Sequence, residues 1–161
     1  MKMLKQMKKF PAAVGFMLLL LPLNFRVQAQ SINRYFSQYR ELADSLSVHY
    51  GIPSTVILAV AFVESGGGTS AVAKKLNNHF GIVGKNNPEV SGLRSRYRHF
   101  PGIRESFVGF CDLVARKKFY SSLKGSGDDK VWLQKIAATG YARNARLWAE
   151  HVYKTIRKSS S

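Results

Sequence analysis

Cysteine is almost absent from this chain, and the side chains that hold metals are scattered along it. Because Cys111 is the single cysteine among 161 residues, no disulfide can form within the chain. Its neighbours include Phe107, Phe110 and Leu113, so we expect a buried and inert thiol rather than a nucleophile. No cluster of His, Cys, Asp and Glu has the spacing of a metal site, so we expect no metal and no cofactor.

Apolar runs long enough to span a membrane are also lacking. Four lysines precede a leucine-rich apolar run at residues 11–25, which is shorter than the roughly 20 residues that span a bilayer. We therefore interpret residues 1–29 as a secretory signal peptide, cleaved after Ala29, rather than as an uncleaved anchor. This predicts a secreted protein, in the periplasm or outside the cell, without stable membrane insertion after cleavage.

Acidic residues are few: nine Asp and Glu stand against 25 Lys and Arg, a formal net charge of +16. The leader contains five basic and no acidic residues, so a mature chain from Gln30 has a net charge of +11. Such a charge favours polyanionic partners. Nucleic acid is one such partner, but export argues against it. Peptidoglycan, with its acidic stem peptides, fits a secreted protein better.

Helical periodicity dominates residues 30–158, and no linker or internal repeat divides them. Apolar residues recur at three- and four-residue steps from 32 to 50, where we expect a helix with Ser31 as its N-cap and Gly51 as its stop. The next expected helix, Pro53–Glu64, is apolar on every side and therefore belongs at the centre of a domain. Further helices are expected near 70–76, 103–117, 128–136 and 144–156. The pattern predicts one compact all-α domain at 30–158, with a small irregular or hairpin lobe at residues 81–100 and a frayed tail at 159–161.

Glu64 has the strongest chemical signal in the sequence. It is the only acid between Asp44 and Glu89, and it lies at the end of the apolar helix. Apolar residues on its own helical face would desolvate the carboxyl and raise its pKa, which allows an acid to stay protonated near neutral pH. The alternative is an exposed residue at a helix end. Because a carboxylate there opposes the helix dipole, we favour a functional role.

Six short segments, in order, resemble one family: the glucosaminidase domain of bacterial autolysins and of flagellar muramidase-type enzymes. The resemblance covers about residues 35–156. The segments are Tyr50-Gly51-Ile52-Pro53, the stretch from Ala61 to Ser70, Asn77-Asn78-His79-Phe80-Gly81-Ile82, Glu105-Ser106-Phe107, Phe119-Tyr120 and Gly140-Tyr141-Ala142. The resemblance implies a lysozyme-like fold of α+β lineage and hydrolysis of β-1,4 bonds after N-acetylglucosamine in peptidoglycan.

The same resemblance implies roles for individual residues. Glu64 falls on the family's catalytic glutamate, and Tyr141 on a tyrosine that faces the cleft and supports catalysis or sugar binding. Asn78, His79 and Phe80 match the segment that shapes the cleft floor. A structural hydrogen-bonding role stays open for His79, and a place in the core for Phe80.

The lobe after these residues departs from the family pattern. Family members usually carry a longer lobe with acidic residues, including a second carboxylate, whereas residues 85–98 are short and basic with Glu89 as their only acid. Glu89 is therefore the candidate for the second catalytic group. Two alternatives stay open: Glu89 is an ordinary solvated residue, or the acetamido group of the substrate serves as the nucleophile.

Aromatic platforms and cations complete the expected binding site. The candidates for stacking on sugars are Tyr97, Phe100, Tyr120 and Trp148, although helical spacing favours a place in the core for Trp148. A basic run beside the expected cleft either contacts stem-peptide carboxylates or is simply solvated; it consists of Arg94, Arg96, Arg98 and Arg104.

These features together predict a monomeric endo-β-N-acetylglucosaminidase that acts on peptidoglycan, with Glu64 as its general acid. The nearest rival is a lytic transglycosylase, which also works with one glutamate on a helix of this kind of fold. A catalytically silent wall-binding domain is the rival from another class, and the acid-poor lobe is the feature that favours it.

Overall fold

The computed structural model describes the backbone of residues 14–159 and the side chains of residues 30–159. The predicted leader at 1–29 thus lies largely outside the description, as do residues 160 and 161 of the expected tail. Residue 159 is the last residue of a helix. Within the described part, no helix is long and apolar enough to cross a membrane.

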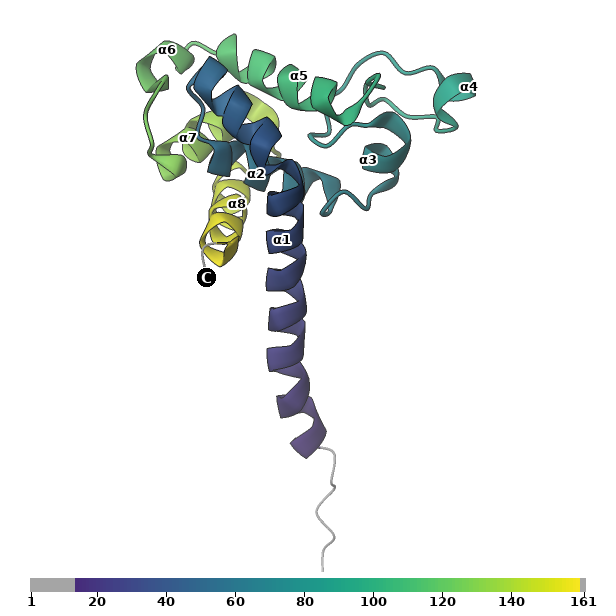
Figure 1. Ribbon diagram of the computed structural model, residues 1–161, viewed down its shortest axis with the longest axis vertical. Helices are drawn as coiled ribbons and strands as arrows, with labels where there is room; N and C mark the ends of the chain where they lie inside the picture. Colours follow the sequence, from purple (N-terminus) through teal and green to yellow (C-terminus); the bar gives the residue numbers. More distant parts are fainter. Residues whose placement is uncertain (1–13, 160–161) are drawn as a thin grey trace, which may run out of the picture.

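Helices dominate the described chain and no strand longer than an isolated bridge occurs in it, which confirms the all-α prediction. Its elements are α1 (Val14–Tyr50), α2 (Ser54–Ser65), α3 (Ala71–Leu76), α4 (Pro88–Ser91), α5 (Ile103–Ala115), α6 (Tyr120–Leu123), α7 (Asp129–Ile136), the π-helical turn η1 (Ala137–Tyr141) and α8 (Ala145–Ser159). Figure 1 shows α1 extending below the body that the other helices form.

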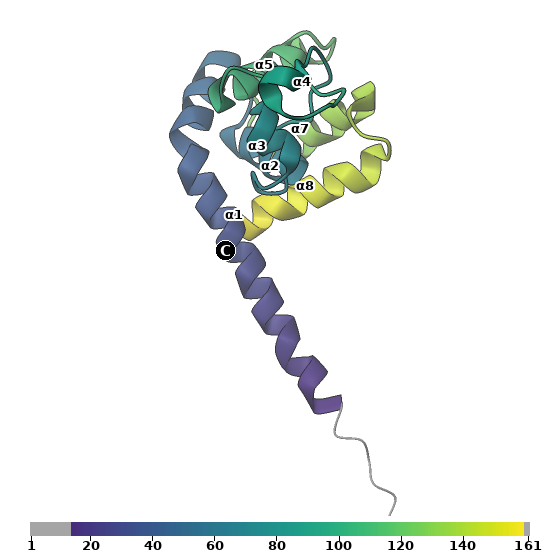
Figure 2. The ribbon, with the colours of Figure 1, turned by 90° about the vertical axis from the view of Figure 1, so that its right-hand side faces the viewer.

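The apolar helix α2 occupies the centre of this body, as its sequence predicted. Its residues from Val56 to Ala61 are completely buried. Helices α1, α5, α7 and α8 all pack against it, and Figure 2 shows α2 between α1 and α8. Surrounding an apolar helix on all sides removes it from water, and this burial is the main source of stability for the fold.

Polar side chains cap the starts of four described helices, α3, α4, α7 and α8. The side chains of Ser70, Asp128 and Asn144 accept hydrogen bonds from the backbone N–H three residues later, at 3.0–3.1 Å. The predicted cap at Ser31 is wrong, because α1 begins at Val14 and Ser31 lies within it. The preceding apolar run is rich in leucine, a strong helix former, and the described helix runs through it into Ser31.

Residues 81–100 form the expected irregular lobe. Among the described residues it contains the single strand-like pairing, an antiparallel bridge between Val83 and Tyr97. The buried side chain of Asn78 closes the base of the lobe, where Nδ2 donates to the carbonyl oxygens of Ile82 and Arg98, both at 2.8 Å. Figure 1 shows the lobe projecting from the body with α4 at its tip.

Candidate active site

Glu64 lies in the last turn of α2 and is half-buried. The chain leaves the helix directly afterwards, because Gly66 adopts a left-handed conformation with φ 59° that ends α2. Burial raises the pKa of the Glu64 carboxyl, as the sequence predicted, while a hydrogen bond from Trp148 and the charge of His151 act in the opposite direction. The polypeptide therefore presents a desolvated carboxyl at the end of a buried helix.

A cavity of about 440 Å³ opens beside this carboxyl. The end of α2, the lobe, the end of α5 and the π-helical turn all contribute to its wall. Its lining residues are Glu64, Phe80, Gly81, Ile82, Val83, Arg96, Tyr97, Leu113, Lys117, Thr139, Gly140 and Tyr141. Glu64 is the single acid among these described lining residues, and it faces a space large enough for sugar rings.

Tyr141 reaches the cavity from the end of η1, where Gly140 turns the backbone with φ 81°. Its hydroxyl donates to the carbonyl oxygen of Phe80 at 2.7 Å. Burial, and to a lesser degree the charge of Glu64, raise the pKa of the Tyr141 hydroxyl well above its ordinary value. The hydroxyl therefore stays protonated and holds the cavity wall together, while the tyrosine ring lines the cavity.

Trp148 contacts Glu64, which the sequence did not predict. Its indole nitrogen donates to Oε1 of Glu64 at 2.6 Å, across 84 residues of chain. Helical spacing alone predicted a core residue, because periodicity shows which side of a helix is apolar but not what the polar edge of an indole contacts. Trp148 is in fact half-buried, and its ring lies 5.3 Å from that of Tyr141.

Two further predicted residues line the cavity. Phe80 contributes to the wall although it is almost wholly buried, with its ring stacked on Phe110 at 4.4 Å. Tyr97 lines the cavity from the lobe and is partly exposed. Of the aromatic platforms predicted from the sequence, Tyr97 is the one at the cavity, and Arg96 lies beside it.

The structure places Asn78, His79 and Phe100 away from the cavity lining. All three are at most 2% exposed, so they have almost no surface to offer a substrate. Asn78 bonds the base of the lobe, and Nδ1 of His79 is hydrogen-bonded to the hydroxyl of Tyr35. Burial lowers the pKa of His79 to about 4, which keeps the ring neutral at physiological pH. Packing and internal hydrogen bonds explain why these three side chains are buried.

The structure does not bring Tyr120 or Glu89 to the cavity beside Glu64 either. Tyr120 begins α6, and its hydroxyl donates to the carbonyl oxygen of Tyr50 at 2.5 Å, tying α6 to the end of α1. Glu89 is exposed on α4 at the tip of the lobe, and it is not among the cavity residues. The side chain of Asn87 caps α4 by accepting from the N–H of Glu89 at 3.0 Å, which fixes this end of the lobe.

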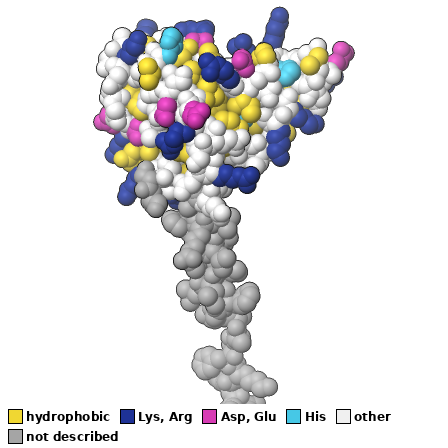
Figure 3. Space-filling model, in the orientation of Figure 1, with side chains coloured by type: hydrophobic (Ala, Val, Ile, Leu, Met, Phe, Trp, Pro, Cys, Tyr) yellow, Lys and Arg dark blue, Asp and Glu magenta, His cyan; other side chains and the backbone are white. Residues whose placement is uncertain are grey.

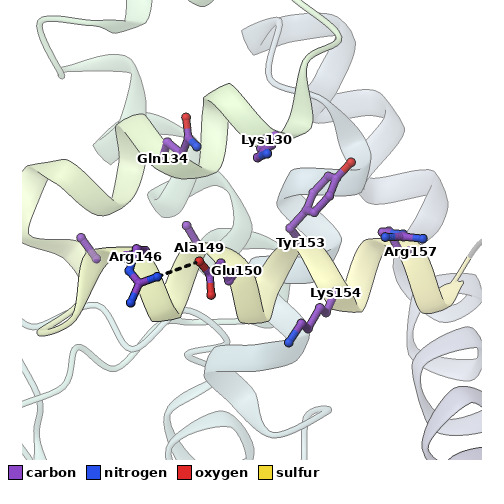
Figure 4. A pocket seen from close by; sticks show the side chains of 9 residues that line it. Lys130, Gln134, Arg146, Ala149, Glu150, Tyr153, Lys154 and Arg157 are labelled. Carbon is purple, nitrogen blue, oxygen red and sulfur yellow. Dashed lines mark ion pairs between the residues drawn. The ribbon is translucent and has the colours of Figure 1, made fainter.

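A second cavity, of about 500 Å³, lies between α7 and α8 (Figure 4). Its single described acid, Glu150, is exposed and forms an ion pair with Arg146 at 3.6 Å. The other charged lining residues are Lys130, Lys154 and Arg157. Because Glu150 is exposed and paired with a cation whereas Glu64 is half-buried at its cavity wall, the smaller cavity beside Glu64 is the better candidate active site.

Positive charge gathers in part at the second cavity, whose lining includes Lys130, Arg146, Lys154 and Arg157. Figure 3 shows Lys and Arg side chains spread over one face of the body. Within residues 30–159, no three His, Cys, Asp or Glu side chains group closely enough to hold a metal ion. The chemistry available at the cavity is therefore that of one desolvated carboxyl with hydrogen-bonding and aromatic neighbours.

The raised pKa of Glu64 predicts an effect on stability. Since the carboxyl binds its proton more tightly in the folded than in the unfolded chain, its stabilising contribution is complete at low pH and is lost as the pH rises through the folded-state pKa. Gln does not titrate. The melting temperature of the Glu64→Gln variant, relative to that of the unchanged protein, is therefore expected to rise from acidic to neutral pH. A relative melting temperature that falls over this range would contradict the burial of this carboxyl.

Comparisons with known proteins identify the family and the fold. The Glucosaminidase family model, described as mannosyl-glycoprotein endo-beta-N-acetylglucosaminidase, matches residues 40–161. No curated protein matches the chain.

Several solved structures share the fold. A peptidoglycan hydrolase from Sphingomonas sp. A1 is 21% identical and aligns over 77% of this chain and 86% of its own, with a TM-score of 0.62. A C-terminally truncated glycoside hydrolase domain of FlgJ from Salmonella typhimurium is 18% identical over 80% and 97%, with a TM-score of 0.65. A type VI secretion system effector–immunity complex from Pseudomonas protegens is 21% identical over 81% and 95%, with a TM-score of 0.59. At these identities the likeness establishes the fold.

Proposed function

Because the chain belongs to the glucosaminidase family, we propose that it hydrolyses peptidoglycan as an endo-β-N-acetylglucosaminidase, with Glu64 as the general acid. The observation that supports this most directly is the half-buried carboxyl of Glu64 at the wall of a cavity, with its pKa raised by burial. Such a group can be protonated at neutral pH and donate to the departing glycosidic oxygen. The similar peptidoglycan hydrolase structure from Sphingomonas sp. A1 supports the choice of substrate.

The second half of the reaction needs a nucleophile or a base. Two-carboxylate glycosidases hold both groups within about 5–10 Å of each other across the scissile bond, but the described cavity lining contains no acid besides Glu64. We therefore favour the acetamido group of the substrate: its carbonyl oxygen attacks C1 as Glu64 protonates the leaving oxygen. Water then attacks C1 and gives a proton back to the Glu64 carboxylate. The ring of the intermediate opens, and the product retains the anomeric configuration.

Exchange of Glu89 tests this choice. The Glu89→Gln variant is expected to release sugar from peptidoglycan at a rate close to that of the unchanged protein, because Glu89 is exposed on α4 and outside the cavity. Release of soluble muropeptides from purified sacculi measures the rate. A loss comparable to that of Glu64→Gln would instead restore Glu89 as the second catalytic group.

Product analysis separates the proposed hydrolase from its rivals. A lytic transglycosylase also needs one acid, so the lone carboxyl at the cavity is compatible with it. Mass spectrometry of digested peptidoglycan should show strands that end in reducing N-acetylglucosamine. Strands that end in 1,6-anhydro-muramic acid would identify a transglycosylase, and sedimentation with sacculi without any release of sugar would identify a wall-binding domain.

Activity on peptidoglycan requires a location in the periplasm or outside the cell, in keeping with the leader expected at residues 1–29. We propose that the protein acts as a monomer. The similar structure from Pseudomonas protegens is an effector–immunity complex, so light scattering with and without candidate inhibitor proteins is the appropriate test of assembly.

A further inference from the structure

The hydrogen bond from Trp148 makes the two oxygens of Glu64 chemically different. Oε1 receives the indole N–H at 2.6 Å. Oε2 lies toward Gly81, where an added methyl group would be 3.5 Å away, and Gly81 lines the cavity. An indole nitrogen donates and never accepts, so this contact cannot reverse its direction when the carboxyl gains a proton.

We propose that Trp148 is a positioning residue for Glu64: its indole occupies Oε1 and so keeps the acidic proton on Oε2, on the side of the cavity. This rests on the proposed function and adds to it the oxygen from which the proton is delivered. A general acid works only when its proton lies within hydrogen-bond reach of the leaving oxygen. A carboxyl free to rotate would divide its proton between the two oxygens, one of which points toward α8.

Tyr141 holds the indole in this position. The two rings lie 5.3 Å apart and tilted by 53°, and the hydroxyl of Tyr141 is fixed by its hydrogen bond to the carbonyl oxygen of Phe80. Contacts therefore run from the base of the lobe through Tyr141 to Trp148 and then to Glu64. Tyr141 acts in this arrangement through its ring, while its hydroxyl remains engaged with the backbone.

Several charged or titratable groups lie around the carboxyl. His151 on α8 acts through its charge, and Tyr141 lies on η1. Arg96 and Tyr97 line the same cavity from the lobe, and Lys117 lines it from just beyond the end of α5. None of these groups is altered when Trp148 is exchanged for another aromatic residue. Loss of the indole donor removes an interaction that favours the charged carboxylate, so the pKa of Glu64 should rise further.

Nitrogen-15 NMR of the labelled protein tests the contact without any need for catalysis. The chain has two tryptophans, and the indole of Trp132 donates to the carbonyl oxygen of Ser126 at 2.9 Å, so it serves as an internal control. The indole N–H signal of Trp148 should shift with pH as Glu64 titrates, and the shift should vanish in Glu64→Gln. An indole signal of Trp148 that ignores Glu64 would overturn the proposal. If the protein has no glycosidase activity but the shift is present, the proposed function fails while the contact stands.

Kinetics then distinguish positioning from packing. Trp148→Phe is expected to lower kcat by about tenfold, as for a slightly misplaced catalytic group, with little change in KM. The basic limb of its pH profile should move to higher pH, because the acid must be protonated to act. The matched variant Trp132→Phe loses an indole hydrogen bond in the core and should keep the pH profile of the unchanged protein. Equal kcat and equal pH profiles in the two variants would refute the role of Trp148; if either variant does not fold, the NMR measurement decides.

Discussion

The Glu64→Gln variant is expected to cleave peptidoglycan about 10²–10⁴-fold more slowly than the unchanged protein, the range typical for loss of a general acid. Gln is nearly the same size as Glu and can still accept the indole hydrogen bond at its carbonyl oxygen, so the fold and the cavity wall should persist. What it lacks is a proton to give to the departing sugar oxygen. Release of reducing ends from purified sacculi measures the loss.

Glu150→Gln provides the matched control for this experiment. Glu150 lies on α8 near Trp148, but its side chain is 52% exposed and paired with Arg146, and it lines the other cavity. Exposed ion pairs contribute little to stability, so this variant should be as stable and as active as the unchanged protein. Equal activity of Glu64→Gln and Glu150→Gln would exclude Glu64 as the acid and would remove the basis of the proposed function.

Exchange of Asn78 is expected to produce the second large effect, this time on stability. The Asn78 side chain makes four hydrogen bonds at the base of the lobe: Nδ2 donates to two carbonyl oxygens, and Oδ1 accepts from the N–H groups of Phe80 and Ile82. Because the residue is 1% exposed, water could not easily replace these partners. Asn78→Ala should therefore lower the free energy of unfolding by about 2–4 kcal/mol, as measured by urea denaturation.

The same exchange should also reduce activity, since the lobe brings Arg96 and Tyr97 to the cavity. Asn87→Ala is the control: Asn87 is exposed and caps the four-residue helix α4 with one hydrogen bond, so its removal should cost about 1 kcal/mol or less. A variant Asn78→Ala with unchanged stability and a raised KM would instead support the substrate contact that the resemblance implied for this residue.

The positions of helices and of the principal acid could be predicted from local sequence. An apolar stretch from Thr55 to Val63 has to be buried wherever it packs, and a carboxyl at its end has to be partly desolvated. The glycines after it, and the caps at Ser70 and Asp128, act on backbone groups within a few residues. Such features depend on near neighbours in the chain, and sequence spacing is enough to reveal them.

The partners of these residues depended on the tertiary structure. Trp148 and Glu64 are 84 residues apart, and their contact exists because one edge of α8 packs on the end of α2. The direction of the lobe likewise placed Glu89 at an exposed tip and Asn78 at a buried base. Periodicity identifies the apolar face of a helix, but the rotation and crossing of two packed helices follow from the fit of many side chains at once. That fit decides which polar atom contacts the Glu64 carboxyl. Because it involves several segments at once, no single segment of the chain predicts it.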